Sequence, residues 1–244
     1  MEISEHIQVV AAEGELLARA AAEAGTDAKV PTCPAWQVRD LLRHTGMVHR
    51  WAAAFLTERR ASYRLGGELP DLDGDALVEW FREGHAALVA TLESAPPDLE
   101  CWTFMPAPSP LAFWARRQAN ETTVHRVDAE SARGGTPSPL DVDFAVDGIE
   151  ELLFGFHARE KSRVRSDVPC VLRVRATDER TWTLRLSDGP PVAEHGATAP
   201  ADCEVSGPAG RLYLALWNRL PFPQVTGDTA LAALWREKSA IVMG

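Results

Sequence analysis

The first two-thirds of the chain contains four stretches in which apolar residues recur every three or four positions. This is the period of a helix with one apolar face. The first stretch, residues 4–25, is rich in Ala, Leu and Glu and ends at Gly25. The other three cover residues 34–56, 75–92 and 111–132. Because few strand signals occur before residue 160, the four stretches predict a helical bundle.

The second stretch is preceded by a segment typical of a turn, Val30-Pro-Thr-Cys-Pro-Ala-Trp. We expect Thr32 or Cys33 to cap the following helix, with Pro34 in its first turn, where a missing N–H costs little. The third and fourth stretches are separated by a loop, because a helix cannot cross its several prolines. Gly134 and Gly135 are expected to end the fourth helix.

The pattern changes in the last third. Residues 143–158 predict one more helix, and residues 171–176 and 181–186 alternate as the two strands of a hairpin do, with a turn at 177–180. A further strand (201–205) and two helices (208–217 and 228–239, the latter capped by Asp228) complete the prediction. The expected domains are a four-helix bundle over residues 1–160 and a small α+β domain over residues 161–244.

Length and charge restrict the class of protein. A chain of 244 residues allows one large domain or two modest ones. A formal net charge of −10 argues against nucleic acid and against an anionic membrane surface as partners, because both would be repelled. The start has no secretory signal, and no apolar run approaches the roughly 20 residues that span a bilayer. The four cysteines are scattered without a CxxC pair, so we expect reduced thiols in a cytoplasmic protein.

Three residues form a candidate metal site. Glu121 and His125 are four positions apart in the predicted fourth helix, so their side chains share a face and can chelate one ion. His44 lies on the inward stripe of the second helix. If the two helices are neighbours, the three groups converge. Two imidazoles and one carboxylate would leave a Zn²⁺-like ion with open positions, which is the mark of a catalytic site.

Spacing by itself leaves an alternative open. Glu2 and His6 have the same separation, and the pattern is not the HExxH of zinc peptidases. In the alternative, His125 pairs with Glu121 at the surface and His44 is a hydrogen-bonded core residue. His49, five positions after His44, lies off its face and is not a candidate ligand.

Two longer segments that contain these residues resemble segments of a known protein family. They are Val30-Pro-Thr-Cys-Pro-Ala-Trp-Gln-Val-Arg-Asp-Leu-Leu-Arg-His44-Thr-Gly and Arg116-Arg-Gln-Ala-Asn-Glu121-Thr-Thr-Val-His125-Arg-Val-Asp128-Ala. Both resemble the mycothiol-dependent maleylpyruvate isomerase family, which belongs to a wider DinB-like group of metal-binding four-helix bundles. The resemblance implies that His44, Glu121 and His125 are the metal ligands. One departure is Asn120, where the family often has His.

The resemblance continues near the C-terminus, in Val205-Ser-Gly-Pro-Ala and Leu214-Ala-Leu-Trp-Asn-Arg219. It implies that Arg219 is a catalytic residue that pairs with an acidic substrate, although an ordinary solvated arginine is the alternative. Asp128 either orients its helix or a ligand, or forms a surface salt bridge with Arg126 or Arg133. Tryptophans such as Trp36 are expected to be core or pocket wall.

The implied function is an isomerase or S-transferase that depends on a divalent metal and on mycothiol or a similar thiol. Zinc and nickel both suit the ligand set. The bound thiol would attack a small electrophile such as maleylpyruvate. Two alternatives use the same site: a metal-dependent hydrolase with bound water as the nucleophile, and a non-catalytic regulatory protein that keeps the metal. The sequence fixes neither the physiological substrate nor the oligomeric state.

Overall fold

The computed structural model describes residues 1–177 and 180–241. Packing divides the chain into two units, Met1–Ser138 and Pro139–Gly244. The first is a four-helix bundle and the second a small α+β unit, which confirms the fold class predicted from the sequence. The division precedes the boundary predicted at residue 160, because the helix that follows Ser138 packs on a later helix of the second unit.

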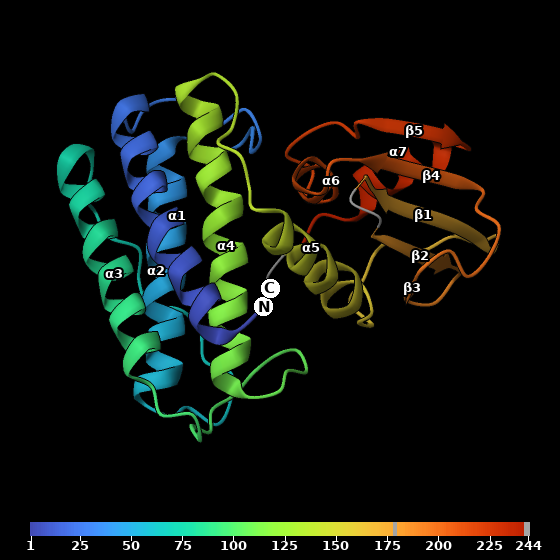
Figure 1. The fold of residues 1–244 in the computed structure, drawn as a ribbon. Coiled ribbons are helices and arrows are strands. Elements are labelled where there is room, and N and C mark those ends of the chain that lie inside the picture. Colours follow the sequence, from blue (N-terminus) through green and yellow to red (C-terminus); the bar gives the residue numbers. More distant parts are fainter. Residues whose placement is uncertain (178–179, 242–244) are drawn as a thin grey trace. The chain divides into compact units, whose positions relative to one another are not determined.

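Four long helices lie side by side in the first unit (Figure 1). The helix α1 packs against α3 and α4, and α2 packs against the same two helices, so α2 and α4 are neighbours. Their bounds are α1 (Ile3–Ala24), α2 (Val38–Thr57), α3 (Gly74–Ser94) and α4 (Pro110–Arg133). All four helices were predicted.

The start of α2 differs from the prediction. Gln37, and not Thr32 or Cys33, is the N-cap, in a capping box with Asp40. Pro34 lies in the preceding turn, outside the helix. The reason is that the segment 29–37 folds back on itself through a bridge between Lys29 and Gln37, and the Thr32 hydroxyl donates to Asp128 of α4. The capping groups expected at the helix end are used in a tertiary contact.

The helix α4 is buried around most of its circumference. Its buried residues include charged and polar side chains, among them Arg117, Asn120, Arg126 and Asp128. Buried charges persist in proteins when they are paired or hold a ligand. The helix that carries two of the three candidate ligands is therefore the polar centre of an otherwise apolar bundle.

The second unit contains a five-stranded sheet in the order β3-β2-β1-β4-β5. The strands β1 and β4 are parallel and the other neighbours antiparallel. Alternate residues such as Leu172, Val174 and Val205 are buried, and α6 and α7 pack against the sheet. The bounds are α5 (Val142–Glu150), the π-helical segment η1 (Glu151–Phe156), β1 (Cys170–Ala176), β2 (Thr181–Leu186), β3 (Val192–His195), β4 (Cys203–Gly207), α6 (Ala209–Leu216), β5 (Gln224–Gly227) and α7 (Thr229–Lys238).

The expected hairpin is present as β1 and β2, and Asp228 caps α7 as predicted. Asp178 and Glu179 of the predicted turn lie outside the described residues. The edge strands β3 and β5 were not predicted. In the part of the chain that the structure describes, no helix is both long and apolar enough to span a bilayer.

Candidate metal centre

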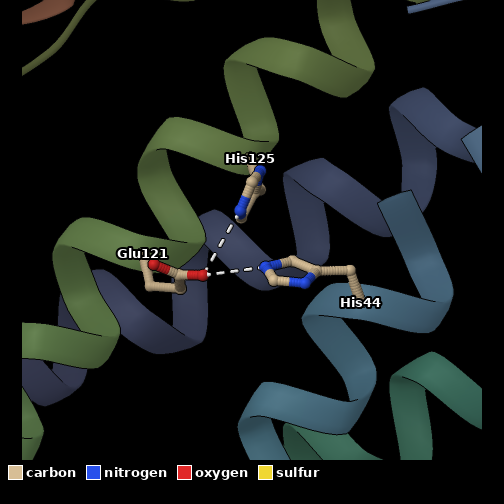
Figure 2. Close-up of side chains that lie close together, drawn as sticks. All are labelled: His44, Glu121 and His125. Carbon is tan, nitrogen blue, oxygen red and sulfur yellow. Dashed lines mark hydrogen bonds and ion pairs between the residues drawn. The ribbon is translucent and has the colours of Figure 1, made fainter. Parts of the chain in front are cut away.

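The side chains of His44, Glu121 and His125 meet between α2 and α4 (Figure 2). One carboxylate oxygen of Glu121, Oε1, lies 3.2 Å from His44 Nε2 and 3.3 Å from His125 Nε2. All three potential donor atoms lie within 4.8 Å of one another. Residues 77 positions apart in the sequence are thus brought to one point by the packing of two neighbouring helices.

This arrangement fits a small divalent ion. Two ligands that are each about 2.0–2.1 Å from one tetrahedral ion lie about 3.3 Å from each other. Both N–O separations in the cluster match that value. The His44 side chain keeps 29% of its surface exposed, whereas His125 keeps 8%, so His44 is the candidate ligand nearer to solvent. The residues present therefore fit a metal with a position left for an incoming molecule.

The orientation of His125 is fixed by Asp128. His125 Nδ1 lies 2.8 Å from Asp128 Oδ2, and an ionised carboxylate only accepts, so Nδ1 is the donor. The remaining nitrogen, Nε2, therefore faces the cluster. Asp128 is fully buried and also accepts from Thr32 Oγ1 at 2.6 Å and from Cys33 Sγ at 3.6 Å. Partners of this kind fix the ring of a ligating histidine.

Electrostatics favour an ionised Glu121. Burial raises the pKa of this carboxyl, but hydrogen bonds with His125 and His44 and the charge of Arg117 outweigh burial and hold the pKa well below its usual value. For His125, burial lowers the pKa, whereas Asp128 and Glu121 raise it to about 9. Without a metal, the cluster therefore holds an ionised Glu121 carboxylate beside a protonated His125.

Trp36 forms one wall of the cluster. Its ring centroid lies 5.0 Å from that of His44 and 5.9 Å from that of His125, nearly parallel to the second ring. The sequence indicated a core or wall role for this tryptophan, and the structure places it against two of the three candidate ligands.

Other residues considered from the sequence lie elsewhere. His49 is fully buried, with Nε2 2.9 Å from Thr122 Oγ1, and burial followed by repulsion from His85 lowers its pKa to about 3. Asn120 is buried and donates to the Arg116 carbonyl oxygen. Arg219 belongs to the second unit, where Nη1 donates to the Trp217 carbonyl oxygen at 2.8 Å. Its catalytic role stays a prediction.

Arg117 was not among the site residues predicted from the sequence. This side chain is 2% exposed, and its Nη2 lies 3.3 Å from Glu121 Oε2. The signal was available, because Arg117 precedes Glu121 by four positions and the two must share a face of α4.

Fold and cluster together define a class: a two-unit protein whose helical bundle presents a His–Glu–His group suited to a divalent metal. Residues 8–130 match the family model for the mycothiol maleylpyruvate isomerase N-terminal domain, and residues 143–234 match the model for the C-terminal domain of the same family. The chain belongs to the mycothiol maleylpyruvate isomerase family. This confirms the predicted family and the expectation that the chain is an enzyme.

Solved structures agree with the fold. A mycothiol-dependent maleylpyruvate isomerase aligns with a TM-score of 0.63 at 13% identity, over 94% of this chain and 94% of that chain. A histidine-to-alanine variant of a mycothiol-dependent maleylpyruvate isomerase aligns with a TM-score of 0.61 at 11% identity, over 89% and 90% of the two chains. Comparison with curated protein sequences gives no significant match. At such identities the structural likeness establishes the fold alone.

Proposed function

We propose that this protein is a divalent-metal-dependent enzyme that activates mycothiol, or a similar small thiol, for attack on a small electrophile. The isomerisation of maleylpyruvate is the first reaction to test. The observation that carries the proposal is the convergence of His44, Glu121 and His125 on one point, with His44 partly exposed to solvent. Membership of the family supports the thiol and the substrate class.

The proposed ligands have separate tasks. Glu121 supplies the negative charge, and the two histidines supply neutral nitrogen donors. Asp128 holds the His125 ring so that Nε2 points inward, while Trp36 covers one side of both rings. A divalent ion held there would favour the thiolate form of a bound thiol, whose pKa of about 8.5 otherwise leaves it mostly protonated at neutral pH.

The thiolate is the nucleophilic form of a thiol. Its addition to the conjugated cis double bond of maleylpyruvate leaves a single bond at that place, about which the adduct can rotate. Expulsion of the same thiol then restores the double bond in the trans form. Thiol is regenerated, so the overall reaction is an isomerisation. An electrophile that keeps the sulfur would instead give an S-transferase.

An acidic substrate needs a cationic partner. We assign this role to Arg219, because a guanidinium pairs well with a planar carboxylate and the family resemblance points to this position. Its replacement by Lys keeps the charge but loses the paired N–H donors. An Arg219→Lys variant should therefore bind metal normally and turn over an acidic substrate poorly.

The decisive experiment is metal analysis of the purified protein beside the His44→Ala and His125→Ala variants. We expect about one zinc or nickel ion per chain in the parent and a loss in both variants, with the helical circular dichroism unchanged. A His49→Ala variant is the matched control, since His49 lies on α2 but outside the cluster. Retention of the metal by both cluster variants would contradict the proposal.

Assays of the metal-loaded protein then separate the functions. Loss of maleylpyruvate only when mycothiol is present supports the isomerase, and a stable thioether product supports the transferase. Turnover of an ester or amide without thiol would instead show the hydrolase. Metal binding without turnover, together with a large fall in melting temperature on chelation, would show a regulatory protein.

A further inference from the structure

The two oxygens of the Glu121 carboxylate have different surroundings. Oε1 faces the imidazoles of His44 and His125, whereas Oε2 is directed away from both (Figure 2). Oε2 lies 3.3 Å from Nη2 of Arg117, one turn earlier on α4. The Arg117 side chain is almost completely buried. Each oxygen of the carboxylate is thus directed to a separate partner.

This division matters because a carboxylate can bind a metal through one oxygen or through both. Binding through both would use a coordination position that the incoming molecule needs. A buried carboxylate oxygen must have a donor, and without one it would turn towards the metal. Arg117 supplies that donor permanently, because a guanidinium stays protonated in proteins and has no acceptor function.

We propose that Arg117 is a positioning residue that keeps Glu121 a one-oxygen ligand and so preserves an open position on the metal. This inference rests on the proposed function and adds a residue to it. The α-helix places the two side chains on one face, four positions apart, so the contact needs no other element to form it.

An ion pair that only stabilises the fold would make the same contacts, but its loss would not change how Glu121 binds a metal. Arg133 also pairs with a glutamate, Glu23, at 3.2 Å, but its side chain is 31% exposed and Glu23 is not in the cluster. Loss of either arginine can lower stability. Only the loss of Arg117 should change how Glu121 binds a metal.

The test uses the full-length protein loaded with Co²⁺, whose visible absorption weakens as coordination rises above four. We compare the parent with Arg117→Met, Arg117→Lys and the control Arg133→Met. Arg117→Met should bind one Co²⁺ but show weaker, shifted visible bands. Arg117→Lys should lie between it and the parent, and Arg133→Met should match the parent. Parent-like bands in Arg117→Met would overturn the inference.

Infrared difference spectra of the metal-free and zinc-loaded parent, with ¹³C-labelled glutamate, test the same point without a variant. A wide separation of the two carboxylate stretches is expected, because it marks binding through one oxygen. A narrow separation in the parent overturns the inference even if Arg117→Met fails to fold. A parent that binds no metal overturns the proposed function and this inference with it, so the two failures are distinguishable.

Discussion

At the scale of single residues, the protein uses buried titratable groups in two ways. His125 is held by carboxylates that raise its pKa to about 9. His157 is also buried, and among the described residues no carboxylate pairs with it, so burial lowers its pKa to about 4. The Nδ1 atom of His157 lies 3.1 Å from Ser162 Oγ, and its ring packs on Trp235. Both residues are histidines, so their different surroundings decide whether the folded protein favours the protonated or the neutral ring.

Asp128→Asn should weaken zinc binding about 10- to 100-fold, because the amide cannot reproduce the charged acceptor that orients His125. The measurement is competitive zinc titration against a chromophoric chelator. Asp75→Asn, at an exposed position in the first turn of α3, serves as the control. Equal zinc affinity in Asp128→Asn and the parent would mean that the buried hydrogen bond does not orient the ligand.

Acid should destabilise the protein through His157. Its pKa is about 4 when folded and 6.5 when unfolded, so between these values the unfolded chain binds more protons and stability falls as the pH falls. Between neutral pH and about pH 4.5 this costs roughly 2–3 kcal/mol. Denaturant titrations at both pH values should show a smaller loss for His157→Gln than for the parent. An equal loss in the two proteins would refute this assignment.

At the scale of elements, α1 and α4 are joined by a buried charge network. Arg126 of α4 is completely buried and contacts Glu13 of α1 at 2.6 Å and Glu130 of its own helix at 2.6 Å. Glu130 also accepts from the backbone N–H and the hydroxyl of Ser138. The network fixes the register of the two helices, and loss of Arg126 would remove the cation that Glu13 and Glu130 share.

Arg126→Met should therefore lower the free energy of unfolding by about 3–5 kcal/mol, because the buried carboxylate of Glu130 and the largely buried one of Glu13 lose their shared cation. Arg133→Met, at a residue of α4 that is 31% exposed and pairs with Glu23 of α1, should cost at most about 1 kcal/mol. Urea denaturation followed by circular dichroism measures both. If Arg126→Met lowers the free energy of unfolding no more than Arg133→Met does, the network contributes little to stability.

The helices were predictable because their apolar positions repeat over twenty residues or more, and the four-residue spacing of Glu121 and His125 placed both on one face. Their proximity to His44 was not predictable from spacing, because periodicity does not say which helices are neighbours; the family resemblance supplied that step. The edge strands β3 and β5 have four residues each, too few for a recognisable alternation. The start of α2 was misplaced because Thr32 serves a tertiary hydrogen bond with Asp128.

At the scale of the whole molecule, the candidate ligands all belong to residues 1–138, and the sheet with its helices belongs to residues 139–244. Each unit has its own buried apolar core, the first around residues such as Leu17 and Leu41, the second around residues such as Val174 and Trp235. A metal that binds only the folded bundle should therefore stabilise one unit directly.

Zinc at about 100 times its dissociation constant should stabilise the bundle by about 2.7 kcal/mol. Hydrogen exchange of the zinc-loaded and metal-free proteins should show added protection in α2 and α4, and much less in β1 and β2. The His44→Ala variant should show no zinc-dependent protection. Protection spread evenly over both units would indicate that they unfold as one cooperative body.

Two of the three candidate ligands, Glu121 and His125, come from α4, and the third, His44, comes from α2. The candidate site is therefore complete only while α2 and α4 stay packed against each other. Heat or pressure that separates α2 slightly from α4 would release the proposed ion, although each helix would keep its helical structure. Loss of metal should accordingly be the earliest sign of a loosening bundle, ahead of any loss of helical signal.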